Sequence, residues 1–120
     1  MKGIIILAHG SREKSTESTL IQIVEMVKQQ VVDYEIEYAF MEFSGKCIEV
    51  GLENLVAKGI KEIVAVPYFL FSGIHIREDI PEELAKFTEK HSDVTITMGQ
   101  TLGVDERLAA VLVDRVKAAL

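Results

Sequence analysis

Short apolar runs alternate with helix-period segments along the whole chain. Residues 3–8 form a continuous apolar run, typical of a strand buried on both faces, and residues 63–66 form a second one. Residues 34–41 alternate with a period of two, and residues 94–98 form a fourth short strand. Because parallel strands are joined by long crossovers, and helical segments lie between these runs, the alternation predicts a parallel sheet with helices packed on it.

Helical spacing marks four segments between and after these strands. Apolar residues recur every three or four positions in each, which gives every segment one apolar face. These faces are formed by Leu20, Ile23, Val24, Val27 and Val31, by Ile48, Leu52, Leu55 and Val56, by Leu84 and Phe87 after Pro81, and by Val104, Leu108, Val111, Leu112 and Val116. The predicted fold is an α/β three-layer sandwich with a four-stranded parallel sheet in the flavodoxin-like order 2-1-3-4. The 120 residues match a single domain spanning 1–120.

Charge and cysteine content restrict the partners. The chain holds 13 Lys and Arg against 19 Asp and Glu, a net charge of −6, whereas general binders of nucleic acid or anionic membranes carry a basic excess. No apolar run approaches the roughly 20 residues that span a bilayer. We therefore expect neither a nucleic acid nor a membrane as partner. The single cysteine, Cys47, excludes an internal disulfide and fits a reducing cytoplasm.

Two of the three histidines follow the strands at which the predicted strand order reverses. Ligands of such sheets bind beyond the carboxyl ends of the strands near this point, here between the first and third strands. His9 follows the first strand and His75 lies in the loop after the third, while His91 falls on the opposite rim. Taken alone, His9 fits equally well a histidine that is hydrogen-bonded to the backbone in a tight turn. His75, taken alone, fits an exposed loop histidine. Together at adjacent strand ends, His9 and His75 indicate a metal-binding or proton-transfer pair.

Other residues at these strand ends extend the candidate site. Glu42 follows the second strand and is either a solvated carboxylate or a third ligand or proton acceptor in the same cleft. The aromatic run 68–71 is mostly core, with one or two rings free to wall a flat apolar ligand. Four basic residues put positive charge on this rim: Arg12, Lys14, Lys46 and Arg77. They are either ordinary surface charges or an anchor for an anionic ligand.

Segments spread over nearly the whole chain resemble the small class II sirohydrochlorin chelatases. They are residues 7–12, 39–42, 66–81 and 102–108, of which residues 67–81 are the most specific. The resemblance implies insertion of a divalent metal, cobalt, nickel or iron, into sirohydrochlorin, an octacarboxylate tetrapyrrole. It also implies a lyase with no tightly bound cofactor, the metal being a substrate, and a homodimer.

The resemblance also implies roles for individual residues. His9 and His75 take the places of the two metal-handling histidines, and Glu42 matches an acidic position of the site. Contacts to the carboxylates of the ring are expected from Ser11, Arg12, Ser72, Gly73 and Arg77.

Apolar residues near the third strand favour a homodimer independently of this resemblance. They offer more apolar surface than one small core needs, and a second copy would supply the other wall of a cleft for a large ring. The residues are Phe69, Leu70, Phe71, Ile74, Ile76 and Ile80.

Two other functions fit parts of the pattern. A non-catalytic carrier of metal or tetrapyrrole would use the same two histidines, but would form no metallated product. A histidine-phosphatase-like enzyme also places His-Gly after its first strand, but its chemistry requires arginine before the histidine, where this chain has Ala8.

Overall fold

The computed structural model describes the backbone of residues 1–120 and every side chain except that of His75, so the predicted role of that side chain lies outside the described residues. No helix in this described part is long and apolar enough to cross a bilayer. The elements are β1 (Lys2–Ala8), α1 (Ser15–Gln30), β2 (Glu35–Phe40), α2 (Ile48–Ala57), β3 (Glu62–Pro67), η1 (His75–Asp79), α3 (Ile80–Lys90), β4 (Thr95–Met98) and α4 (Glu106–Ala119). The predicted strands and helices are confirmed, and η1 is an added π-helical turn before α3.

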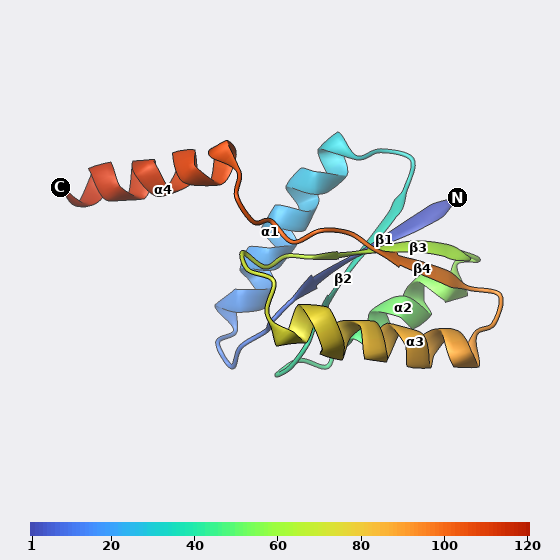
Figure 1. Ribbon diagram of the computed structural model, residues 1–120. Coiled ribbons are helices and arrows are strands. Elements are labelled where there is room, and N and C mark those ends of the chain that lie inside the picture. Colours follow the sequence, from blue (N-terminus) through green and yellow to red (C-terminus); the bar gives the residue numbers. More distant parts are fainter.

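The four strands form one parallel sheet in the order β2-β1-β3-β4, which confirms the predicted topology. The α1 helix lies on one face of the sheet, and α2 and α3 lie on the other (Figure 1). This gives three layers, because the crossovers β1-α1-β2 and β2-α2-β3 run in opposite directions across the sheet, and right-handed crossovers then fall on opposite faces.

The core is divided by the sheet, and β1 contributes to both parts. Ile5 and Leu7 are fully buried in the cluster under α2 and α3. Ile6 belongs to the cluster under α1, together with Leu20 and Val24 of that helix. Successive side chains of a strand point to opposite faces, so the continuous apolar run of β1 follows from burial on both sides.

The last helix differs from the expected sandwich. All of α4 is described, and none of its side chains is buried. Val104, predicted on its apolar face, lies before the helix and is fully exposed. Figure 1 shows α4 projecting from the body of the molecule. The whole chain, with α4 included, measures 54 × 31 × 28 Å. The periodicity predicted the helix correctly, but this chain alone does not cover its apolar face.

Candidate functional site

Three loops meet at the carboxyl edge of the sheet and are held there by backbone hydrogen bonds. The Tyr68 amide donates to the Leu7 carbonyl over 2.7 Å, which continues β3 alongside the end of β1. On the other side of β1, the Met41 amide donates to the Ala8 carbonyl over 2.9 Å and the Glu42 amide to the His9 carbonyl over 3.1 Å. The backbone of His9 is thereby fixed between the loops that follow β2 and β3, at the predicted point where strand order reverses.

Gly10 allows the close approach of two of these loops. Its φ is 87°, in the left-handed region that side chains disfavour, and a Cβ placed there would lie 2.1 Å from the Glu42 carbonyl oxygen. Only glycine fits this contact without moving backbone. The turn at Gly10 therefore sets both the position of His9 before it and that of Ser11 and Arg12 after it.

An apolar hollow of about 380 Å³ opens beside His9. The His9 ring lies 4.2 Å from the ring of Phe69, centroid to centroid, with the planes tilted by 46°. Phe69 is only 6% exposed and forms a fixed wall, whereas Phe71 at the rim is 81% exposed. The complete lining is His9, Tyr68, Phe69, Leu70, Phe71, Gly73 and Ile76. One imidazole thus faces a surface suited to a flat apolar ligand.

A second hollow of about 320 Å³ begins at Gly10 and is polar, with the carboxylates of Glu13 and Glu17 in its lining beside two cations. Arg12 and Lys14 both line it, and the Arg12 guanidinium carbon lies 5.0 Å from the ring centroid of Phe43. A guanidinium on an aromatic face is oriented by the ring and keeps its N–H donors for anions. The Ser11 hydroxyl is hydrogen-bonded to the Thr16 hydroxyl and accepts from the Glu13 amide over 3.1 Å. Within this mixed-charge hollow, the oriented Arg12 guanidinium is therefore the group suited to bind a carboxylate.

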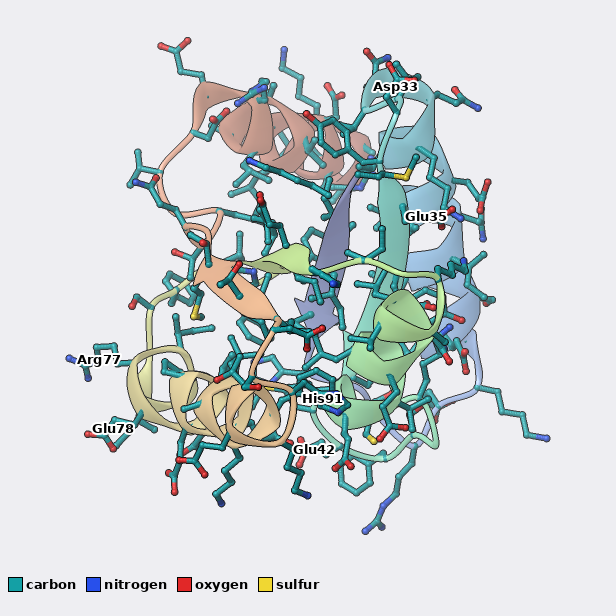
Figure 2. All side chains as sticks on the ribbon, turned by 90° about the vertical axis from the view of Figure 1, so that its right-hand side faces the viewer. Asp33, Glu35, Glu42, Arg77, Glu78 and His91 are labelled. Atoms are coloured by element: carbon teal, nitrogen blue, oxygen red, sulfur yellow. The ribbon has the colours of Figure 1, made fainter. Side chains whose placement is uncertain are left out.

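The other predicted site residues are placed differently. The backbone of Glu42 is tied to His9, but its exposed carboxylate lines neither hollow. Ser72 lines a separate hollow of about 440 Å³ with residues 98–104. Arg77, on η1, is exposed and points outward, as does the neighbouring Glu78 (Figure 2). Roles for Glu42, Ser72 and Arg77 stay predictions.

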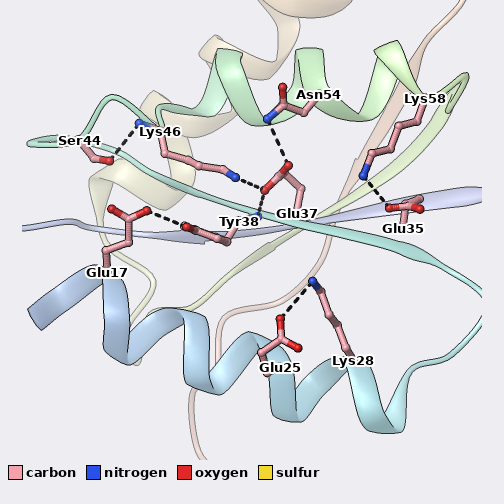
Figure 3. Close-up of polar contacts among 10 residues, drawn as sticks. All are labelled: Glu17, Glu25, Lys28, Glu35, Glu37, Tyr38, Ser44, Lys46, Asn54 and Lys58. Atoms are coloured by element: carbon pink, nitrogen blue, oxygen red, sulfur yellow. Dashed lines mark hydrogen bonds and ion pairs between the residues drawn. The ribbon is translucent and has the colours of Figure 1, made fainter.

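Lys46 is engaged by a neighbouring strand residue rather than open to a ligand. Its Nζ lies 2.5 Å from Oε1 of Glu37 on β2 and 4.3 Å from the ring centroid of Tyr38. The Tyr38 amide and the Asn54 side chain also donate to the Glu37 carboxylate, over 3.0 and 3.3 Å (Figure 3). Burial alone raises the pKa of Glu37, but these hydrogen bonds and the charge of Lys46 lower it overall. Lys46 is therefore mainly a structural cation.

Tyr38 carries a second polar contact from the same strand. Its hydroxyl donates to Oε2 of Glu17 on α1 over 2.7 Å (Figure 3). Burial, followed by this hydrogen bond to a carboxylate, raises the pKa of Tyr38 to about 12. The phenol is therefore neutral across the physiological range and links α1 to β2.

His91 lies on the rim opposite His9, as predicted. It follows the last residue of α3, and its ring stacks on that of Phe87 at 4.2 Å with the planes 19° apart. Among the described side chains, which exclude that of His75, no three His, Cys, Asp or Glu residues are grouped closely enough to hold a metal ion.

Two parts of the sequence interpretation change. Phe69 and Ile80, predicted as interface residues, are buried in the core, while Leu70, Phe71 and Ile74 are exposed. Phe43, whose ring contacts the Arg12 guanidinium, was not predicted as a site residue. It follows the end of β2 by only three positions. Applying the strand-end rule to apolar residues as well as to charged ones would have found it.

Replacing Gly10 tests the tight contact beside His9. We expect Gly10→Ala to lower the free energy of unfolding by roughly 1–3 kcal/mol, because the new methyl group collides with the Glu42 carbonyl and φ is unfavourable. Chemical denaturation measures this loss. Gly45→Ala is the control, since its Cβ would meet nothing within 4 Å. Equal stability of the two variants would contradict the close approach at Gly10.

The ion pair of Lys46 predicts a pH-dependent contribution to stability. Because the pKa of Glu37 is lowered in the folded state, its stabilisation is present above the ordinary value of 4.5 and is lost as pH falls through the folded value. We expect Lys46→Met to unfold more easily than wild type by about 1 kcal/mol near neutral pH, and this difference to shrink below pH 4.5. Lys58→Met, which removes a more exposed pair with Glu35, should cost less. A difference independent of pH would contradict the assignment.

Known proteins match this chain over nearly its full length. The CbiX family model matches residues 3–119. The sirohydrochlorin cobaltochelatase of Sulfurisphaera tokodaii is 32% identical, and the match covers 100% of this chain and 95% of that protein. The sirohydrochlorin ferrochelatase of Priestia megaterium is 33% identical over 97% of this chain, which spans only 44% of that protein.

Solved structures agree with these matches. The sirohydrochlorin chelatase SirB of Bacillus subtilis subspecies spizizenii, in complex with cobalt, superposes with a TM-score of 0.91 at 31% identity, over 98% of this chain and 50% of SirB. A CbiX protein of Marinobacter aquaeolei, described as a cobalamin biosynthesis protein, gives 0.80 at 28% identity, over 99% and 97% of the two chains. The chain described above belongs to the CbiX family.

Proposed function

We propose that the chain inserts a divalent metal ion, cobalt or ferrous iron, into sirohydrochlorin, in the biosynthesis of a metal-bearing tetrapyrrole. The observation that carries the proposal is the junction at Gly10, where an apolar hollow holding His9 adjoins a polar hollow holding Arg12. Family membership supports it. A relative of similar length is named sirohydrochlorin cobaltochelatase, and a relative about twice as long is named sirohydrochlorin ferrochelatase.

The chemistry of insertion requires a base near a flat ring. A divalent ion that enters the macrocycle displaces two pyrrole N–H protons, which must pass to acceptors. A neutral imidazole is able either to hold the incoming ion or to accept a proton. His9 has this chemistry and lies against the apolar wall formed by Phe69. The metal is a substrate here, so an incomplete ligand set that releases it is appropriate.

His75 and Glu42 complete the proposed catalytic set. His75 begins η1, in the segment that follows β3, and its assignment as the second metal-handling histidine rests on the family resemblance. Glu42 is assigned as a proton acceptor at the rim, supported by the hydrogen bond that ties its amide to the His9 carbonyl.

The carboxylates of sirohydrochlorin supply binding energy at the edge of the ring. Arg12 and Ser11 are proposed to bind them in the polar hollow, and Ser72, Gly73 and Arg77 from the side of β3. Binding energy gained at the periphery is available to bend the ring, which exposes the nitrogen lone pairs to the metal.

Residues 1–120 are proposed to work as a single chelatase domain and as a homodimer. Leu70, Phe71 and Ile74 leave apolar surface exposed beside the His9 hollow, and a second copy there would shield the ring from water. Anaerobic assays of sirohydrochlorin with cobalt, nickel and ferrous iron, followed by absorbance, test the activity and its metal preference. Stoichiometric binding without a metallated product would instead indicate a carrier.

Histidine substitutions test the catalytic assignment. We expect His9→Ala and His75→Ala each to lower the insertion rate by about 100-fold or more, because a metal-handling base is removed. His91→Ala should retain close to the wild-type rate, since His91 stacks on Phe87 at the opposite rim. Initial rates with the preferred metal provide the measurement. A His9→Ala variant that turns over normally would refute the role of this imidazole.

Arg12 tests the proposed anchor for carboxylates. We expect Arg12→Gln to raise KM for sirohydrochlorin by roughly 10-fold with a smaller change in kcat, because a charge-assisted contact to the ring periphery is lost. Lys61→Gln is the matched control, since it removes one exposed positive charge at the far end of the sheet. Equal effects of the two substitutions would show that only the overall charge matters.

A further inference from the structure

The apolar face of α4 has no cover within the chain. Leu108, Leu112 and Val116 are spaced four residues apart, and Val111 adjoins them, so they share one side of the helix. Leu112 is 64% exposed, and Val111 and Val116 are each about half exposed. An isolated helix of 14 residues is only marginally stable in water, so this face needs a partner surface.

The sheet has a matching uncovered half. Strand register aligns Ile4 with Val64 and Val64 with Thr97, and residues paired in this way point to the same face. On that face Ile4 packs with the cluster under α1, whereas Thr97 is exposed and Val64 only half-buried. The opposite face of β3 and β4 is covered, because Ile63 and Ile96 pack in the cluster with α2 and α3. The half of the sheet beside α1, over β3 and β4, therefore lacks a helix.

The connection from β4 holds α4 away from this surface. The Leu102 amide donates to the Phe69 carbonyl over 2.9 Å, and the Gly103 amide donates to the Leu70 carbonyl over 3.0 Å. Gly103 then turns the chain with a φ of 60°, and the Asp105 side chain caps α4 by accepting from the Arg107 amide over 2.8 Å. The helix starts beyond the carboxyl edge of the sheet and runs outward (Figure 1).

We propose that α4 packs on the uncovered half of the sheet of a second copy, and that the second copy returns its own α4 in the same way. One symmetric contact then covers both unpartnered surfaces of each chain, whereas an unrelated partner would have to cover the helix and the sheet separately. The sizes match, since α4 is about 21 Å long and β3 about 20 Å. The exchange does not depend on the chelatase activity.

The exchange also determines how the two copies face each other. Because α4 leaves from the edge that carries His9, a helix that reaches the partner's sheet brings the carboxyl edges of the two sheets toward each other. The exposed Leu70 and Phe71 then lie between the copies, beside the apolar hollow.

Cross-linking distinguishes exchange from packing of α4 on its own sheet. The background is Cys47→Ser, which removes the single native thiol. Leu112→Cys and Thr97→Cys are then combined in one chain and treated with a short bifunctional thiol reagent. We expect covalent dimers on a denaturing gel. A cross-link within single chains, or no cross-link between these positions, would overturn the proposal. Ala110→Cys with Thr97→Cys, on the opposite side of α4, is the control and should link far less.

Sedimentation at micromolar concentration provides the second test. Wild type is expected to be a dimer. Leu112→Asp should be a monomer, because a carboxylate is placed in the exchanged contact, while Ala110→Asp adds the same charge on the exposed side and should remain a dimer. A cooperative unfolding transition, followed by circular dichroism, confirms that the body of Leu112→Asp is folded. A monomeric wild type, or a dimer that survives Leu112→Asp, would refute the exchange.

Discussion

The burial of β1 on both faces is the constraint on which the rest of the structure depends. Ile5 and Leu7 pack toward α2 and α3 while Ile6 packs toward α1, so helices must cover both sides of this strand. Its neighbours β2 and β3 run parallel to it, and their loops therefore emerge at the same edge as His9. The placement of one catalytic candidate thus follows from a requirement of the core.

An apolar surface and a polar surface lie next to each other in the candidate site, within a few residues of the chain. His9 and Gly10 are consecutive, yet the first lines an apolar hollow and the second opens a polar one. The chain as a whole is acidic, with a net charge of −6, and Lys46 is neutralised by Glu37. Arg12 on the ring of Phe43 and Lys14 are the cations that line the polar hollow, beside the carboxylates of Glu13 and Glu17.

Sequence periodicity was sufficient to find the strands and helices, and the flavodoxin-like order then assigned to four parallel strands was correct. Together they placed His9 at the edge where ligands bind, because the ends of parallel strands have a fixed geometric meaning. Periodicity was not sufficient within the run Tyr68–Phe71, where four apolar residues in a row carry no period, so Phe69 in the core and Phe71 at the rim looked equivalent. The pairing of Lys46 with Glu37 depends on how the loop after β2 returns beside the strand, which spacing alone does not reveal. Likewise, the apolar face of α4 was visible in the sequence, but the surface that covers it was not.

If α4 is exchanged between two chains, the structure around His9 depends on the protein concentration. Two separate chains meet by collision, so dilution would uncover the helix and the sheet together. Joining two such units in one polypeptide converts that encounter into an intramolecular one, with an effective concentration set by the linker. The Priestia relative, of which this chain spans 44%, has enough length for a second unit of this size. In a tandem arrangement of this kind, the same contact between α4 and the sheet would persist at any dilution.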